Sequence, residues 1–280
     1  MRLVSFIRQD STASYGTTDG EIVRDAGSTL NGEYSDLRGV LAAGAVSELE
    51  GCGPEIALRD VTLLPPVSNP DKILCIGLNY MSHIKETGRD KPKFPSIFTR
   101  YPSSIVGHGT PLIRPRVSDT FDYEGELAVV IGKSCRNVPL ANAMDVIAGY
   151  SCFNDGTIRE YQTHTTQFWP GKNFEASGSM GPWIMTPDEL GEITQQTLTT
   201  RINGNVEQQA GIDDLAISIP ELIAYASTVI TLEPGDVIAT GTPGGVGKFR
   251  NPQLYMTSGM MAEVEISGIG TLANSVVDDT

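Results

Sequence analysis

The sequence predicts a β-rich α+β fold that carries a small N-terminal unit. Thirty glycines and seventeen prolines interrupt the 280 residues at short intervals. The runs between them are short and rich in β-branched residues, or alternate between apolar and polar residues, and few repeat every 3.6 positions. Hydrophobic residues make up 40% of the chain, which is enough to bury a sizeable core. We therefore expect many short strands and few helices.

The expected strands are apolar or alternating runs bounded by turn residues. They cover residues 73–77, 127–131, 198–202, 237–240 and 261–266. Two helices are expected, at residues 140–144 leading into Val146 and at residues 219–229. In the second helix, Ser218 is a suitable N-cap and Pro220 is compatible with the first turn.

A proline-rich segment, LLPPVSNP at residues 63–70, predicts a linker between two parts of the chain. Residues 1–66 would then form a small N-terminal accessory domain, and residues 67–280 would form the catalytic domain. No fixed-period repeat is present in the sequence, which argues against a solenoid or a propeller.

Charge and composition exclude several classes of partner. The formal net charge of −14 would repel nucleic-acid phosphates and anionic membrane surfaces, so neither is an expected partner. The N-terminal segment lacks the pattern of a signal peptide, and no later run is apolar for the roughly 18 residues that a membrane span needs. A cytoplasmic location is the expectation. The four cysteines show no CxxC pairing and are expected to be reduced.

The motif DYEGELAVVIG places Glu124 and Glu126 two residues apart at the start of a strand-like run. Because side chains alternate along a strand, both carboxylates should point to the same face. Asp155, in FNDGTIRE, follows another apolar run and is positioned to converge as a third carboxylate. Such an all-oxygen set suits Mg²⁺ or Mn²⁺. The structural alternative is an acidic, solvated face of an edge strand.

His83 and Glu86, in GLNYMSHIKE, are three residues apart, so a helical turn would bring their side chains together. A carboxylate beside an imidazole orients it and raises its basicity, and such a pair can remove a proton from water near a metal. The alternative is a surface pair on a short helix. His108 and His164 have no comparable partner and receive no role.

Further polar residues follow the proposed metal ligands. Lys172, in WPGKNFE, could bind a substrate carboxylate or an enolate oxygen, or it could be an ordinary exposed lysine. The segment TGTPGGVG lacks the ending of a phosphate-binding P-loop. It is interpreted either as a tight turn that presents Thr242 and backbone N–H groups to an anion or as a plain structural turn. No GxGxxG fingerprint supports a dinucleotide-dependent oxidoreductase.

Taken in order, the motifs GLNYMSHIKE, DYEGELAVVIG, NDGTIREYQ, WPGKNFE and TGTPGGVG resemble those of the fumarylacetoacetate hydrolase family from about Lys72 onward. The resemblance implies a mixed β-sandwich roll, a homodimer, and Mg²⁺ or Mn²⁺ held by three carboxylates. It also implies a lid segment that carries the water-activating pair, and a lysine that assists at the reacting carbonyl. The implied metal ligands are Glu124, Glu126 and Asp155. The implied catalytic residues are His83, Glu86 and Lys172. The residues implied to hold a small anionic 2-oxo acid are Arg159, Gln162 and Thr242.

The predicted function is hydrolysis of the carbon–carbon bond of an acylpyruvate, such as maleylpyruvate or fumarylpyruvate, to pyruvate and a carboxylic acid, a step typical of aromatic catabolism. The alternatives are an oxaloacetate-type decarboxylase, or a hydratase or isomerase of ring-cleavage intermediates. A non-catalytic metal-binding or scaffold protein with the same fold is the alternative from another class. The chain departs from the common family pattern at residues 172–175 and 179–182, which affects the expected substrate choice more than the metal ligands.

Overall fold

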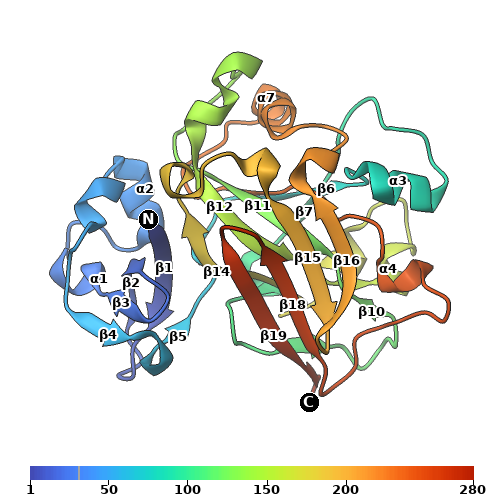
Figure 1. Cartoon of the computed structure of the whole chain (residues 1–280), viewed down its shortest axis with the longest axis horizontal. Helices are drawn as coiled ribbons and strands as arrows, with labels where there is room; N and C mark the ends of the chain where they lie inside the picture. The colour runs from blue at the N-terminus through green and yellow to red at the C-terminus, as the bar shows by residue number, and fades with distance from the viewer. Residues whose placement is uncertain (31) are drawn as a thin grey trace.

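The computed structural model describes residues 1–30 and 32–280. Figure 1 shows the N-terminal segments gathered in a lobe beside a larger body in which two sheets face each other. The lobe and the body are joined by backbone hydrogen bonds, because β1 (Arg2–Ile7) pairs antiparallel with β14 (Gly178–Met185). One sheet therefore runs from the lobe into the body.

Within the described residues, that main sheet has 12 strands, in the order β4-β3-β2-β1-β14-β12-β11-β17-β6-β7, with β5 on β1 and β8 on β14. Its remaining strands are β2 (Ala13–Thr18), β3 (Ile22–Arg24), β4 (Glu55–Ala57), β5 (Thr62–Leu63), β6 (Ile73–Gly77), β7 (Ser96–Arg100), β8 (Ile105–Val106), β11 (Gly125–Ile131), β12 (Ile147–Asn154) and β17 (Val237–Ala239). The predicted strands at residues 73–77, 127–131 and 237–240 all lie in the interior of this sheet.

A second sheet of five strands, in the order β16-β15-β18-β19-β9, lies over β11, β12 and β14 and completes the sandwich (Figure 1). Two further strands, β10 and β13, form a separate two-stranded sheet among the described residues. The bounds are β9 (Leu112–Arg114), β10 (Phe121–Asp122), β13 (Thr157–Ile158), β15 (Thr197–Ile202), β16 (Asn205–Gly211), β18 (Met261–Ile266) and β19 (Gly270–Asp278). The remaining two predicted strands correspond to β15 and β18, so the predicted mixed, β-rich α+β fold is confirmed.

Helices are short, and among the described residues none combines the length and apolarity that a bilayer span requires. The α-helices are α1 (Ala26–Thr29), α2 (Leu37–Ala43), α3 (Met81–Thr87), α4 (Arg159–Gln162), α5 (Trp169–Lys172), α6 (Pro187–Leu190) and α7 (Ile219–Val229). The 3₁₀-helices are η1 (Val46–Leu49), η2 (Leu58–Asp60), η3 (Pro102–Ser104), η4 (Leu140–Val146), η5 (Ile193–Gln195), η6 (Ile212–Asp214) and η7 (Gly247–Phe249).

One predicted helix is confirmed and the other needs correction. Helix α7 has the predicted bounds, with Ser218 as N-cap and Glu221 completing a capping box. Residues 140–146 form the 3₁₀-helix η4 and not an α-helix. This segment runs only from Pro139 to the start of β12 at Ile147, and such a short connection favours the tighter turn.

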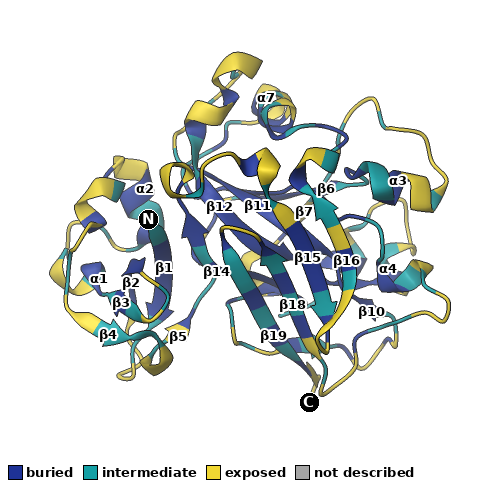
Figure 2. Ribbon diagram, viewed as in Figure 1, coloured by how far each residue is buried: buried dark blue, intermediate teal, exposed yellow. Residues whose placement is uncertain are grey.

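Strand β11 is buried on both faces, which makes it the centre of the molecule (Figure 2). Leu127 and Val129 point into the core between the two sheets. Ala128 and Val130 point to the other side, toward a second core that includes residues of the N-terminal helices. Glu126 belongs to the same even-numbered set of side chains, so it points to the face of the main sheet that lies away from the second sheet.

Candidate metal centre and active site

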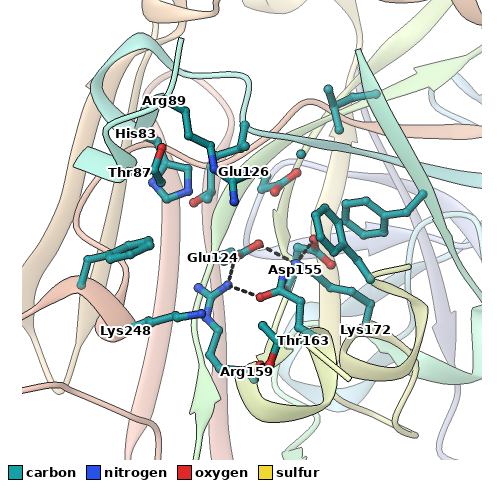
Figure 3. Close-up of a pocket in the computed structure, with 18 residues that line it drawn as sticks. His83, Thr87, Arg89, Glu124, Glu126, Asp155, Arg159, Thr163, Lys172 and Lys248 are labelled. Carbon is teal, nitrogen blue, oxygen red and sulfur yellow. Dashed lines mark hydrogen bonds and ion pairs between the residues drawn. The ribbon is translucent and has the colours of Figure 1, made fainter. Parts of the chain in front are cut away.

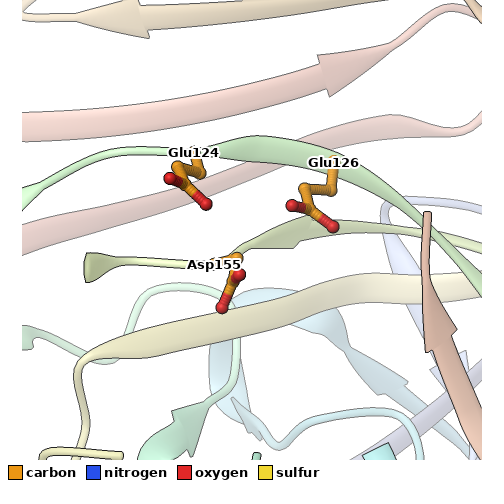
Figure 4. A group of neighbouring side chains, drawn as sticks. All are labelled: Glu124, Glu126 and Asp155. Atoms are coloured by element: carbon orange, nitrogen blue, oxygen red, sulfur yellow. The ribbon is translucent and has the colours of Figure 1, made fainter. Parts of the chain in front are cut away.

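Three carboxylates meet where β11 begins and β12 ends (Figure 4). Glu124, Glu126 and Asp155 each offer an oxygen within 4.8 Å of the others. The antiparallel pairing of β11 and β12 causes this convergence, because Gly125 lies opposite Asn154 and the Asp155 backbone N–H donates to the Glu124 carbonyl at 2.9 Å. All three side chains are buried, and β11 lies between β12 and β17. The edge-strand interpretation of the acidic pair is therefore wrong.

The three carboxylates differ in their positive neighbours. Glu124 pairs with Arg159 at 2.5 Å and with Lys172 at 2.6 Å. Asp155 pairs with Arg100 at 2.7 Å and with Lys172 at 2.5 Å. Glu126 accepts a hydrogen bond from the backbone N–H of Gly241 at 2.9 Å and has no cationic partner among the described residues. One of three adjacent buried carboxylates thus lacks a counter-charge.

This difference appears in the pKa values of the two glutamates. Burial raises the pKa of Glu124, but the charges of Lys172 and Arg159 outweigh burial and lower it to about 2. Burial raises the pKa of Glu126 well above its usual value, and the charges of Asp155 and Glu124 raise it further. A hard divalent cation bound by the three oxygens would offset this repulsion, so the donor set fits Mg²⁺ or Mn²⁺.

A pocket of about 150 Å³ opens over the carboxylates (Figure 3). Eight of the nine predicted site residues line it: His83, Glu124, Glu126, Asp155, Arg159, Gln162, Lys172 and Thr242. Glu86 is the ninth, and it reaches the pocket only through His83. Lining residues without a predicted role include the cations Arg89 and Lys248 and the aromatic residues Phe98, Phe168 and Phe249.

His83 and Glu86 lie on α3, and their contact agrees with the predicted helical turn. His83 Nδ1 and Glu86 Oε2 are 2.9 Å apart, and Glu86 Oε1 accepts from the backbone N–H of Gly245 at 3.0 Å. Burial raises the pKa of Glu86, but these hydrogen bonds outweigh burial and lower it. His83 is only 7% exposed, whereas Glu86 is exposed, so the pair extends from the pocket to the surface. With Nδ1 bound to a carboxylate, Nε2 is the ring nitrogen available to a ligand.

The glycine-rich segment does bind anions through backbone N–H groups, but these anions are carboxylates of the protein itself. The N–H groups of Gly241, Gly245 and Gly247 donate to Glu126, Glu86 and Asp122, respectively. At Gly241, φ is +104°, and a Cβ would lie 2.8 Å from that of Asn79, so only glycine fits this turn. The segment thus fixes three acids around the pocket and is more than a plain turn.

Thr242 lines the pocket, but its hydroxyl already has partners. The hydroxyl donates to the Gly125 carbonyl at 2.9 Å and accepts from Gln208 Nε2 at 2.8 Å. Substrate binding by Thr242 stays a prediction. Lys172 is 1% exposed, so its interpretation as an ordinary exposed lysine is wrong. Burial lowers the pKa of Lys172, but Asp155 and Glu124 outweigh burial and raise it, so the ammonium group remains charged.

Arg159 connects the carboxylates to the pocket. Its Nε donates to Asp122 at 2.7 Å, and its Nη1 donates to Glu124 and, at 3.2 Å, to Gln162. Its buried Nη2 has no hydrogen-bond partner within the described part of the chain. A buried guanidinium nitrogen without a partner is costly, so this atom is suited to a ligand oxygen.

Two residues that organise the site were not predicted. Asp122 holds Arg159, and its place two residues before Glu124, in the same motif, was an available signal. Arg100 binds Asp155 from 55 positions earlier in the chain, where nothing in the local sequence marks it.

Comparison with known proteins places these features in context. The family model described as fumarylacetoacetate (FAA) hydrolase C-terminal matches residues 72–277. An oxaloacetate tautomerase of Bacillus subtilis (strain 168) is 41% identical over 79% of this chain and 74% of its own length. The mitochondrial oxaloacetate tautomerase fahd2 of Xenopus laevis is 35% identical over 99% of this chain and 90% of its own.

A solved structure gives a further match. Maleylpyruvate hydrolase from Sphingobium sp. SYK-6, in complex with manganese(II) ion and pyruvate, is 28% identical, with a TM-score of 0.83 and 100% coverage of both chains.

Replacing Glu126 tests the metal centre. We expect Glu126→Gln to weaken Mn²⁺ binding by about a hundredfold or more, because one of three ligand charges is lost. Isothermal titration calorimetry measures the affinity, and circular dichroism checks the fold. The matched control is Glu86→Gln, which removes a carboxylate that lies outside the cluster and contacts His83, and it should keep Mn²⁺ affinity within about twofold. Equal losses in the two variants would contradict the assignment of the ligands.

Metal affinity should also depend on pH. Because burial and two neighbouring carboxylates raise the pKa of Glu126, this group is protonated over a wider pH range than an ordinary glutamate. Metal binding requires the ionised form, so affinity should rise with pH and binding should release a proton. Titrations in two buffers of different ionisation enthalpy measure the released proton. Glu126→Gln should release fewer protons than the parent protein, and equal release would argue against Glu126 as the source.

Proposed function

Because the chain belongs to the fumarylacetoacetate hydrolase family, we propose that it is a divalent-metal-dependent enzyme that interconverts the enol and keto forms of oxaloacetate. The observation that carries the proposal is the pairing of a buried carboxylate cluster with an oriented histidine across one small pocket. Two oxaloacetate tautomerases with 35% and 41% identity support oxaloacetate as the substrate.

The 2-oxo acid end of the substrate would bind at the base of the pocket. Arg159 Nη2 is buried and free to donate to a carboxylate oxygen, and Gln162 lies beside it. Lys172 adds a fixed positive charge next to the carboxylate cluster. Mg²⁺ or Mn²⁺ held by Glu124, Glu126 and Asp155 would act as a Lewis acid that stabilises negative charge on the substrate oxygens. The manganese in the maleylpyruvate hydrolase structure supports this choice of ion.

The reaction itself is a transfer of protons. In converting enol to keto, the proton of the 2-hydroxyl group leaves, the C2–O bond becomes a carbonyl, and C3 gains a proton. His83 is suited to take the 2-hydroxyl proton at Nε2 and then to deliver a proton to C3, because Glu86 holds its Nδ1 and His83 lines the pocket. Glu86 would stabilise the positive ring between the two proton transfers.

Hydrolysis of an acylpyruvate is the second candidate, favoured by the same histidine and by the likeness to maleylpyruvate hydrolase. In that reaction His83 would remove a proton from water, whose oxygen then bonds to the distal carbonyl carbon. The carbon–carbon bond breaks, and its electron pair remains with pyruvate as the enolate, which then takes up a proton. Oxaloacetate has a carboxylate in place of that distal carbonyl, so the two substrates separate the two functions.

Product analysis tests the proposal. With Mn²⁺, the parent protein should accelerate loss of the ultraviolet absorbance of the oxaloacetate enol and give a product of unchanged mass. Release of CO₂ would instead indicate a decarboxylase, and formation of pyruvate and maleate from maleylpyruvate would support the hydrolase. If none of these substrates is converted, the proposed enzyme function is contradicted.

The role of His83 has its own test. We expect His83→Gln to lower kcat for tautomerisation by about 10²–10⁴-fold and to leave Mn²⁺ affinity unchanged, because the general acid–base group is lost and the metal ligands remain. His164→Gln is the matched control, since His164 is exposed and does not line the pocket. A His83→Gln variant with parental activity would exclude His83 as the proton-transfer group.

A further inference from the structure

Two cations line the pocket outside the carboxylate cluster and have no acidic partner in the described part of the chain. Arg89 is exposed and follows α3, and Lys248 is half-buried in η7. Throughout residues 1–30 and 32–280, neither side chain forms an ion pair or a hydrogen bond, although Lys248 Nζ lies 6.0 Å from the ring centre of Phe249. The pocket cations Arg159 and Lys172, by contrast, are both bound to carboxylates.

The backbone of Lys248 is anchored by the same carboxylate that holds Arg159. The Asp122 carboxylate accepts from Arg159 Nε at 2.7 Å and from the backbone N–H groups of Gly247 and Lys248 at 2.8 and 2.9 Å. Burial and the charge of Arg159 lower the pKa of Lys248. An anionic ligand at Lys248 would therefore stabilise the charged ammonium group, to which the described residues offer no ion pair.

Arg89 is positioned by the same helix that carries His83. Gly88 ends α3 with a φ of +67°, and the Arg89 backbone N–H donates to the Ile84 carbonyl at 3.3 Å. Figure 3 shows Arg89 beside His83, and Lys248 on the side of Arg159. Arg89 thus borders the pocket next to the proton-transfer group, whereas Lys248 borders it next to Arg159, and both are away from Lys172.

We propose that Arg89 and Lys248 bind the distal carboxylate of the substrate and thereby select 2-oxo dicarboxylic acids over monocarboxylic ones. The proposal rests on the proposed function only for the orientation of the substrate, with its 2-oxo acid end at Arg159. A chain with a net charge of −14 repels a dianion at long range, so binding requires unpaired cations inside the pocket. Charge-assisted hydrogen bonds to the distal carboxylate would meet that requirement.

Binding of two unreactive ligands tests this subsite without turnover. L-Malate and L-lactate share the 2-hydroxy acid end, and only malate has a distal carboxylate. Calorimetry with the Mn²⁺-loaded protein should show that the parent binds malate about tenfold or more tightly than lactate. The double variant Arg89→Met with Lys248→Met should lose this preference through weaker malate binding, while the lactate affinity stays the same.

Two controls separate a specific contact from a general change in charge. Lys91→Met removes a cation from the loop after α3 that does not line the pocket, and it should leave the malate preference unchanged. The charge-conserving pair Arg89→Lys with Lys248→Arg should keep most of the preference. Equal affinity of the parent for malate and lactate, or equal weakening of both ligands in the double variant, would overturn the proposal.

The malate test and the tautomerase assay can fail independently of each other. If the parent does not tautomerise oxaloacetate but the double variant loses its malate preference, the function is wrong and the subsite stands. If the parent tautomerises oxaloacetate and the double variant keeps its malate preference, the function stands and the subsite is wrong.

Discussion

The site depends on one constraint, which is the burial of four carboxylates at the junction of β11 and β12. Asp122, Glu124, Glu126 and Asp155 are each no more than 6% exposed. Charges removed from water need partners, and breaking such a buried pair typically costs about 3–5 kcal/mol. The fold supplies three buried cations from separate segments of the chain, together with backbone N–H groups of the glycine-rich segment. Since Glu126 receives one such N–H group and no cationic partner among the described residues, a further cation would complete the cluster.

This arrangement gives the pocket a floor in the main sheet and a wall of short helices. The floor consists of carboxylates in the main sheet, whose spacing follows from the register of β11 on β12. The wall is formed by the seven-residue helix α3 and by η7, short elements held by single carboxylates such as Asp214 at the Ser82 N–H and Asp122 at the Lys248 N–H. In this chain the floor is suited to stabilising an enolate, whereas the wall carries the histidine that would move protons.

The parts of the structure that could be predicted are those encoded by local spacing. Alternation along β11 placed Glu124 and Glu126 together, and a spacing of three placed His83 against Glu86. Long-range contacts have no such local signal, which is why Arg100 was missed. The 3₁₀ form of η4 depends on the neighbouring strand and not on helix propensity. The partners of the glycine N–H groups could not be predicted either, because these N–H groups donate to acids more than 100 residues away in the chain, as Gly241 does to Glu126.

Asp122 links the two ends of the pocket, although it does not line it. Burial raises its pKa, which the charge of Arg159 opposes, and its two oxygens accept from Arg159 and from the backbone of η7. The same carboxylate therefore sets the direction of the Arg159 guanidinium, whose Nη2 has no partner among the described residues, and the position of the Lys248 backbone. A ligand that contacts both cations would therefore depend on Asp122 for the placement of the Arg159 guanidinium and of the Lys248 backbone, whereas the Lys248 side chain would still lose rotamer entropy on binding. Part of the selectivity would then originate in a residue that does not line the pocket.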